Sequence, residues 1–208
     1  MNAVLIPVRS ISGAKRRLAE TLDRPSRQRL ALGMLNDMLA ALERASSVGR
    51  VAVVSADEAL LRHASLLGAE VIEEGRPRGL NAAVALAAAV LEENGVDRLL
   101  TIPGDVPLIG GAEVDRLFAT DPAAHPVVLV PSASGSGTNG LLTSPPTVIL
   151  SRFEGNSLKA HQQACREAGI EPLVLPLQGF MLDVDTPDDL TAMRAATAAG
   201  RSVVRATG

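Results

Sequence analysis

The sequence predicts one α/β domain whose mostly parallel, twisted sheet is covered by helices on both faces. Short β-branched runs alternate with helical patterns along the chain, an order that requires right-handed crossovers and parallel strands. Hydrophobic residues make up 47% of the 208 residues and aromatic residues 1%, so small aliphatic side chains must fill the interior, as in layered α/β proteins. We therefore expect a single Rossmann-like domain over residues 1–200 and a frayed tail at 201–208.

Six short runs have the length and composition of buried strands. They are Ala3–Val8, Arg50–Ser55, Glu70–Glu73, Arg98–Ile102, Pro126–Pro131 and Pro172–Leu175. Between the first two, apolar residues from Ala31 to Leu42 recur at helical spacing, and Pro25 and Ser26 suit a helix start. Further helical patterns cover residues 58–67, 80–94, 111–118, 157–168 and 187–199.

Charge and cysteine content exclude several functional classes. The 20 basic and 23 acidic residues give a formal charge of -3, which provides no broad positive surface for nucleic acid or an anionic membrane. Cys165 is the only cysteine, so an intramolecular disulfide or a cysteine zinc cluster is excluded, and its helical neighbours favour a packed side chain over a nucleophile.

The N-terminal apolar run is too short for a signal peptide, and no apolar stretch is long enough to span a bilayer. We expect a cytoplasmic protein.

Ligands of open α/β sheets bind beyond the carboxyl ends of the strands, and a basic, glycine-containing loop follows the first strand. Backbone N–H groups and basic side chains in such a loop can hold a triphosphate, so Pro7 and Val8 are expected to contact a nucleotide. The spacing matches neither a Walker loop nor G-x-G-x-x-G, and a merely solvated loop explains this segment about as well. The basic residues are Arg9, Lys15, Arg16 and Arg17.

Two acidic segments predict a magnesium site. Asp105 follows the fourth strand between Pro103-Gly104 and Pro107, where a rigid backbone would project its carboxylate into the crevice. In an extended D-V-D, Asp183 and Asp185 would point to the same side. Together the three carboxylates could bind one or two Mg²⁺ ions, which prefer oxygen ligands. The alternative for Asp105 is an Asx-turn that only shapes the loop.

Two further segments suggest an anion site and a base contact. Thr138 and Ser157 could hold a small anion at a helix N-terminus, although plain helix capping by Ser157 is a common alternative. His161, one turn later, could be a ligand contact, a capping-turn residue or solvated. In Arg78-Gly79-Leu80-Asn81, the amide of Asn81 offers a donor and an acceptor for a base edge, or the segment is an ordinary helix start.

These segments, in this order, resemble the guanylyltransferases of deazaflavin coenzyme F-420 biosynthesis, the 2-phospho-L-lactate and phosphoenolpyruvate guanylyltransferase family. The resemblance is carried by I-P-V-R with A-K-R-R-L, R-G-L-N, P-G-D-V-P-L, G-T-N-G-L-L, F-E-G-N-S with His161, and D-V-D-T-P-D-D-L. It covers nearly the whole chain and implies the nucleotide-diphospho-sugar transferase-like fold. Arg9 stands where the family usually has Lys, and Glu154 adds bulk and negative charge beside the acid pocket.

The resemblance also implies the substrates and the roles of individual residues. GMP would pass from GTP to the phosphate of phosphoenolpyruvate, 2-phospho-L-lactate or 3-phosphoglycerate, with hand-off of the product to a downstream transferase. The family places the metals on Asp105, Asp183 and Asp185. The implied nucleotide contacts include Pro103, Gly104, Gly79, Leu80 and Asn81, and the implied acceptor contacts are Thr138, Asn139, Glu154, Gly155 and Ser157.

The expected reaction is in-line attack of the acceptor phosphate on the α-phosphorus of GTP. Arg9, Lys15 and Arg17 would hold the β- and γ-phosphates and stabilise the departing pyrophosphate. Two alternatives remain at this point: a cytidylyltransferase or molybdopterin guanylyltransferase of the same fold, and a non-catalytic nucleotide-binding module.

Overall fold

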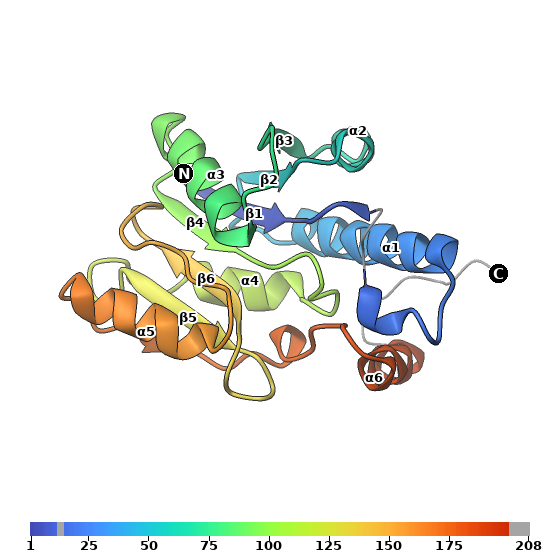
Figure 1. Cartoon of the computed structure of the whole chain (residues 1–208). Coiled ribbons are helices and arrows are strands. Elements are labelled where there is room, and N and C mark those ends of the chain that lie inside the picture. The colour runs from blue at the N-terminus through green and yellow to red at the C-terminus, as the bar shows by residue number, and fades with distance from the viewer. Residues whose placement is uncertain (12–14, 200–208) are drawn as a thin grey trace.

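The computed structural model describes residues 1–11 and 15–199. Over these residues, seven strands form one sheet in the order β3-β2-β1-β4-β6-β5-β7 (Figure 1). The strands are β1 (Asn2–Pro7), β2 (Arg50–Ser55), β3 (Glu70–Glu73), β4 (Arg98–Thr101), β5 (Val127–Pro131), β6 (Thr138–Thr143) and β7 (Leu173–Val174). The α-helices are α1 (Arg24–Glu43), α2 (Glu58–Leu66), α3 (Leu80–Glu93), α4 (Gly111–Phe118), α5 (Ser157–Glu167) and α6 (Pro187–Ala198), with short 3₁₀ helices η2 (Arg16–Leu18) and η3 (Gln178–Phe180).

The sheet is mixed because β6 runs against its neighbours. β1 pairs in parallel with β2 and β4, whereas β6 is antiparallel to both β4 and β5. The prediction missed β6, since Asn139 and Gly140 have low strand propensity. Gly140 is required there, because a Cβ atom would lie 2.9 Å from Val130 Cγ2 and 3.1 Å from the Phe180 ring.

Helices pack on both faces of the sheet, as predicted. On one face, α1, α2 and α4 bury Val4, Ile6 and Leu100 of the sheet. On the other face, α3 packs on Leu5 and Leu99, while α5 covers the β5 and β6 region. The other six strands and the α-helices agree with the predicted bounds to within two residues, because each has the periodicity typical of its type.

Three further observations concern the start of α6, the predicted tail and the possibility of a membrane-spanning helix. α6 begins with a capping box in which Thr186 and Asp189 bond each other's backbone N–H groups, as expected for acidic residues in a first helical turn. The predicted tail at 201–208 lies outside the described residues. Of the helices that the structure describes, none is both long and apolar enough to cross a membrane.

Candidate active site

The candidate active site lies at the edge of the sheet where β1 and β4 end. The Pro103-Gly104-Asp105 turn follows β4 directly and folds back onto β1, with Gly104 N–H donating to the Pro7 carbonyl at 3.3 Å. A Cβ atom on Gly104 would lie 2.8 Å from Val8 Cγ2. Glycine is therefore needed for this close approach, which fixes where Asp105 leaves the sheet.

Lys15 joins the two acidic segments. Its Nζ lies 3.1 Å from Asp105 Oδ2 and 3.1 Å from Asp185 Oδ1, although the two carboxylates come from distant parts of the chain. The Lys15 side chain is only 9% exposed, and its backbone is left-handed, with φ at 52°. One buried cation is thus held between two carboxylates at the predicted metal position.

The D-V-D segment lies outside the strands of the sheet, between η3 and α6. The Val184 side chain is fully buried and packs with Met34, Leu190 and Met193. Its N–H donates to the Asp105 carbonyl at 2.9 Å. α6 and this backbone bond therefore fix Asp183 and Asp185 beside the Asp105 turn.

Asp183 is half-buried beside the other two carboxylates. Burial raises its pKa, and the negative charges of Asp105 and Asp185 raise it further, against a hydrogen bond from Asn139. Within the described part of the chain, no three Asp, Glu, His or Cys side chains are already arranged around one metal position. The positive charge between Asp105 and Asp185 comes from Lys15 instead.

The basic loop, of which the structure describes residues 8–11 and 15–18, contributes Lys15 and Arg17 to this group of charges. Arg17 is 75% exposed and lies 3.7 Å from Asp185, and Arg9 is also exposed. Nearer the strand, Ser10 and the Ile11 N–H both contact Asp57. Two of the three predicted phosphate-binding residues are thus open to a ligand, whereas Lys15 is engaged with the carboxylates.

The R-G-L-N segment forms the start of α3. Gly79 has φ at 96°, a conformation that favours glycine. The Asn81 side-chain oxygen accepts a hydrogen bond of 2.7 Å from the Phe153 N–H. This bond uses one lone pair of the oxygen, so Asn81 keeps its NH₂ group and a second acceptor lone pair for a base edge.

A buried polar network lies at the opposite side of the site. Ser157 Oγ accepts from the Thr138 N–H at 2.8 Å, and Thr138 Oγ1 lies 3.0 Å from His161 Nδ1. His161 Nε2 accepts from the Arg152 N–H, so Nδ1 carries the proton that is donated to Thr138. Each of Thr138, Ser157 and His161 is at most 3% exposed.

The contacts in this network distinguish between the alternative roles predicted for His161 and Ser157. His161 is not solvated, and burial lowers its pKa to about 4, so the ring is neutral near pH 7. Ser157 does not cap α5, since Asn156 accepts from the Lys159 N–H and is the N-cap. The contacts of Thr138 and Ser157 with an acceptor stay predictions.

Of the remaining predicted acceptor residues, Asn139 lies beside a carboxylate and Glu154 lies beside the R-G-L-N segment. Asn139 Nδ2 donates to the Phe180 carbonyl at 2.7 Å and lies 3.4 Å from Asp183 Oδ1. Glu154 and Gly155 are exposed, and Glu154 Oε1 lies next to Gly79. The segments predicted to bind acceptor and nucleotide therefore meet at this edge.

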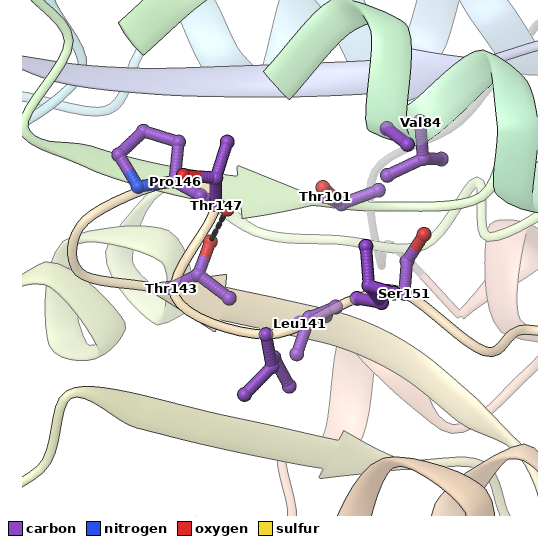
Figure 2. Close-up of a pocket in the computed structure, with 10 residues that line it drawn as sticks. Val84, Thr101, Leu141, Thr143, Pro146, Thr147 and Ser151 are labelled. Atoms are coloured by element: carbon purple, nitrogen blue, oxygen red, sulfur yellow. Dashed lines mark hydrogen bonds between the residues drawn. The ribbon is translucent and has the colours of Figure 1, made fainter. Parts of the chain in front are cut away.

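One cavity of about 60 Å³ lies under α3 (Figure 2). It is lined by Val84, Thr101, Leu141, Thr143 and Ser151, with neighbouring residues of the 146–151 loop. None of the residues that line this cavity is among the predicted site residues.

Comparisons with known proteins identify the family of the chain. The family model described as Guanylyl transferase CofC like matches residues 2–198. The chain belongs to this family. Phosphoenolpyruvate guanylyltransferase of Conexibacter woesei is 37% identical over 198 residues, covering 95% of this chain and 89% of the relative. The 2-phospho-L-lactate guanylyltransferase of Methanothermobacter thermautotrophicus is 39% identical over 186 residues, covering 89% of this chain and 81% of the relative.

A solved structure supports the fold of this guanylyltransferase. A nucleotidyl transferase from Methanothermobacter thermautotrophicus superimposes with a TM-score of 0.71 at 15% identity, over 96% of this chain and 99% of the other. The nucleotide-diphospho-sugar transferase-like fold predicted from the sequence is therefore confirmed, and the chain is a nucleotidyltransferase.

Proposed function

We propose that this protein transfers GMP from GTP to the phosphate of a small phosphorylated carboxylic acid and releases pyrophosphate. The observation that carries the proposal is the convergence of Asp105 and Asp185 on the cation of Lys15, beside a basic loop. A nucleotidyl transfer needs such a place, where positive charge can meet a triphosphate. The names of the two relatives support a guanylyl donor and a phosphorylated acid acceptor.

Magnesium fits the residues at this position. Asp105, Asp183 and Asp185 offer only oxygen ligands, which Mg²⁺ prefers, and two of them already hold a cation. When bound there, one or two Mg²⁺ ions would neutralise phosphate charge and polarise the phosphoryl oxygens.

The chain's own cations would orient the triphosphate. Arg9, Lys15 and Arg17 hold its β- and γ-phosphates in this proposal and stabilise the departing pyrophosphate. The acceptor phosphate attacks the α-phosphorus in line, and the bond from that phosphorus to the α–β bridging oxygen of GTP breaks, so that this oxygen leaves with pyrophosphate. A phosphate monoester is largely ionised near neutral pH, so positioning replaces a strong general base.

The acceptor is proposed to bind between the start of β6 and the N-terminus of α5. The exposed turn at Glu154 and Gly155 opens at this helix N-terminus, which favours an anion. Buried Thr138 and Ser157 fix the turn, and Asn139 lies between it and Asp183. Hand-off of the diphosphate-linked product to a downstream transferase belongs to the same proposal.

Pyrophosphate release tests the proposal directly. Each of the four NTPs is combined with phosphoenolpyruvate, 2-phospho-L-lactate and 3-phosphoglycerate in the presence of Mg²⁺. We expect release with GTP and at least one acid, and the conjugate at the corresponding mass. Turnover with CTP alone would support a cytidylyltransferase, and nucleotide binding without product would support a non-catalytic module.

A further inference from the structure

We propose that Asp57 is a positioning residue that fixes the base of the basic loop against α2. The inference rests on the proposed function, in which this loop holds the triphosphate of GTP. Asp57 lies outside every segment that the sequence comparison associates with substrate, and it comes two residues after the end of β2.

The two oxygens of the Asp57 carboxylate serve different elements. Oδ2 accepts from the Ser10 hydroxyl and from the Ile11 N–H, both at 2.9 Å. Oδ1 accepts from the Ala59 and Leu60 N–H groups and so caps the N-terminus of α2. One side chain therefore joins the loop that follows β1 to the helix that follows β2.

The neighbouring strands explain why this residue reaches the loop. β1 and β2 are parallel and adjacent, and the Val8 N–H continues their pairing by donating to the Val54 carbonyl at 3.0 Å. The Asp57 N–H is bonded to Ser55 Oγ, which keeps the carboxylate at the same edge. Burial opposes ionisation of Asp57, but the hydrogen bonds from Ser10, Ile11 and α2 outweigh it and lower the pKa.

The Asp57 contact complements the one made by Lys15. Residues 10 and 11 are bonded to Asp57, and Lys15 is bonded to Asp105 and Asp185. When a triphosphate draws Lys15 away from the carboxylates, the Asp57 contact still fixes residues 10 and 11. Arg9, next to Ser10, then keeps its place beside the nucleotide.

Two substitutions separate this role from helix capping. In Asp57→Asn, the remaining oxygen can cap α2 because Asn is as good an N-cap as Asp, but an NH₂ group replaces the acceptor for Ile11. In Asp57→Ser, the hydroxyl also caps well, and the shorter side chain cannot reach the loop. Asp23→Asn is the matched control, because Asp23 caps α1 through the Ser26 N–H and makes no hydrogen bond to the described residues of the basic loop.

The first measurement is limited trypsin cleavage of the free protein, followed by mass spectrometry. The sites after Arg9, Lys15, Arg16 and Arg17 lie in the basic loop. Loss of bonds to a charged acceptor should raise local opening, so we expect cleavage there to be roughly ten-fold faster in both Asp57 variants. The control should cleave at the wild-type rate, and thermal denaturation should show all variants folded.

The second measurement is steady-state kinetics with GTP and the best acceptor. We expect the KM for GTP to rise about ten-fold in both Asp57 variants, with kcat within roughly two-fold and the acceptor KM unchanged. A merely structural role would lower the active fraction, and hence kcat, without this selectivity. Unchanged cleavage, or faster cleavage with an unchanged KM for GTP, would overturn the role of Asp57.

Failure of the proposed function would look different. The wild-type protein would then release no pyrophosphate from any NTP, whereas the cleavage rates would still report whether Asp57 fixes the loop. If wild type and variants are cleaved equally and the wild type is active, the positioning role of Asp57 is wrong and the proposed function stands.

Discussion

The two sides of the candidate active site hold their polar groups in opposite ways. At the nucleotide side, Lys15, Asp105 and Asp185 are joined by ion pairs, and the carboxylates remain 32% and 41% exposed. At the α5 side, Thr138 and His161 are joined by neutral hydrogen bonds in a buried network. An incoming ligand can replace an ion pair at an open edge, whereas a buried network resists exchange. The first side is suited to binding and the second to positioning.

The largest expected effect is the loss of a carboxylate on the open side. Asp105→Asn keeps the size of the side chain but removes a charge proposed to bind metal, so we expect kcat to fall by at least about 100-fold. Steady-state pyrophosphate release at saturating Mg²⁺ measures it. Asp188→Asn is the control, because Asp188 is exposed in the first turn of α6. Unchanged turnover in Asp105→Asn would remove this residue from the mechanism.

Lys15→Met tests the nucleotide side further, because we expect the affinity for a divalent metal to rise while turnover falls. Without the ammonium group between Asp105 and Asp185, a divalent ion meets no competing charge, so we expect Mn²⁺ to bind the nucleotide-free protein several-fold more tightly. Electron paramagnetic resonance of free Mn²⁺ measures this affinity. Turnover should fall by roughly ten-fold or more, since Lys15 is proposed to hold phosphate. Weaker Mn²⁺ binding would show that the carboxylates do not form the metal site.

His161→Gln tests the buried side through pH. The pKa of His161 is lowered to about 4 in the folded protein, below about 6.5 when unfolded. Unfolding therefore takes up a proton between these values, so this contribution to stability is complete above pH 6.5 and is lost as pH falls towards 4. We expect a loss on the order of 3 kcal/mol in the wild type.

Chemical denaturation at pH 7 and at pH 4.5 provides the measurement for His161. The change in unfolding free energy between the two pH values should be smaller in His161→Gln than in the wild type, whatever the variant's stability at pH 7. Equal changes in the two proteins would mean that His161 is not held neutral by burial.

The smallest effect concerns Cys165 on α5, in the same buried layer. The thiol is fully buried, and burial raises its pKa to about 11. We expect a thiol reagent to leave the folded protein unmodified at pH 8 and to react only after denaturation. Rapid modification of the native protein would show that α5 opens easily.

The sequence predicted the layered fold well because strand and helix patterns alternate clearly. It did not predict β6, because Asn139 and Gly140 have low strand propensity, although this strand is buried along its whole length. The same topological rule that singled out Asp105 applies to Asp57, which also follows a parallel strand. A single Asp before a helix is explained by capping alone, so the sequence of this segment does not distinguish the second role.

Prediction of the site was less complete than prediction of the fold. The order of the motifs along the chain predicted that Asp105, Asp185 and Lys15 lie at one edge of the sheet. It could not show that Lys15 contacts both carboxylates, because that depends on side-chain positions 90 and 170 residues apart. The network of Thr138, Ser157 and His161 was equally hidden, since each residue alone is explained by capping or by solvent.

The reversal of β6 determines which part of the molecule is free to vary. Its register with β4 brings the hairpin loop 132–137 to the edge where β1 and β4 end, and Ala133–Ser136 are exposed. Exposed loops accept insertions more readily than strands do. A longer hairpin would reshape the acceptor pocket while leaving β1 and β4 in place, so related chains could evolve new acid specificities without rebuilding the nucleotide half.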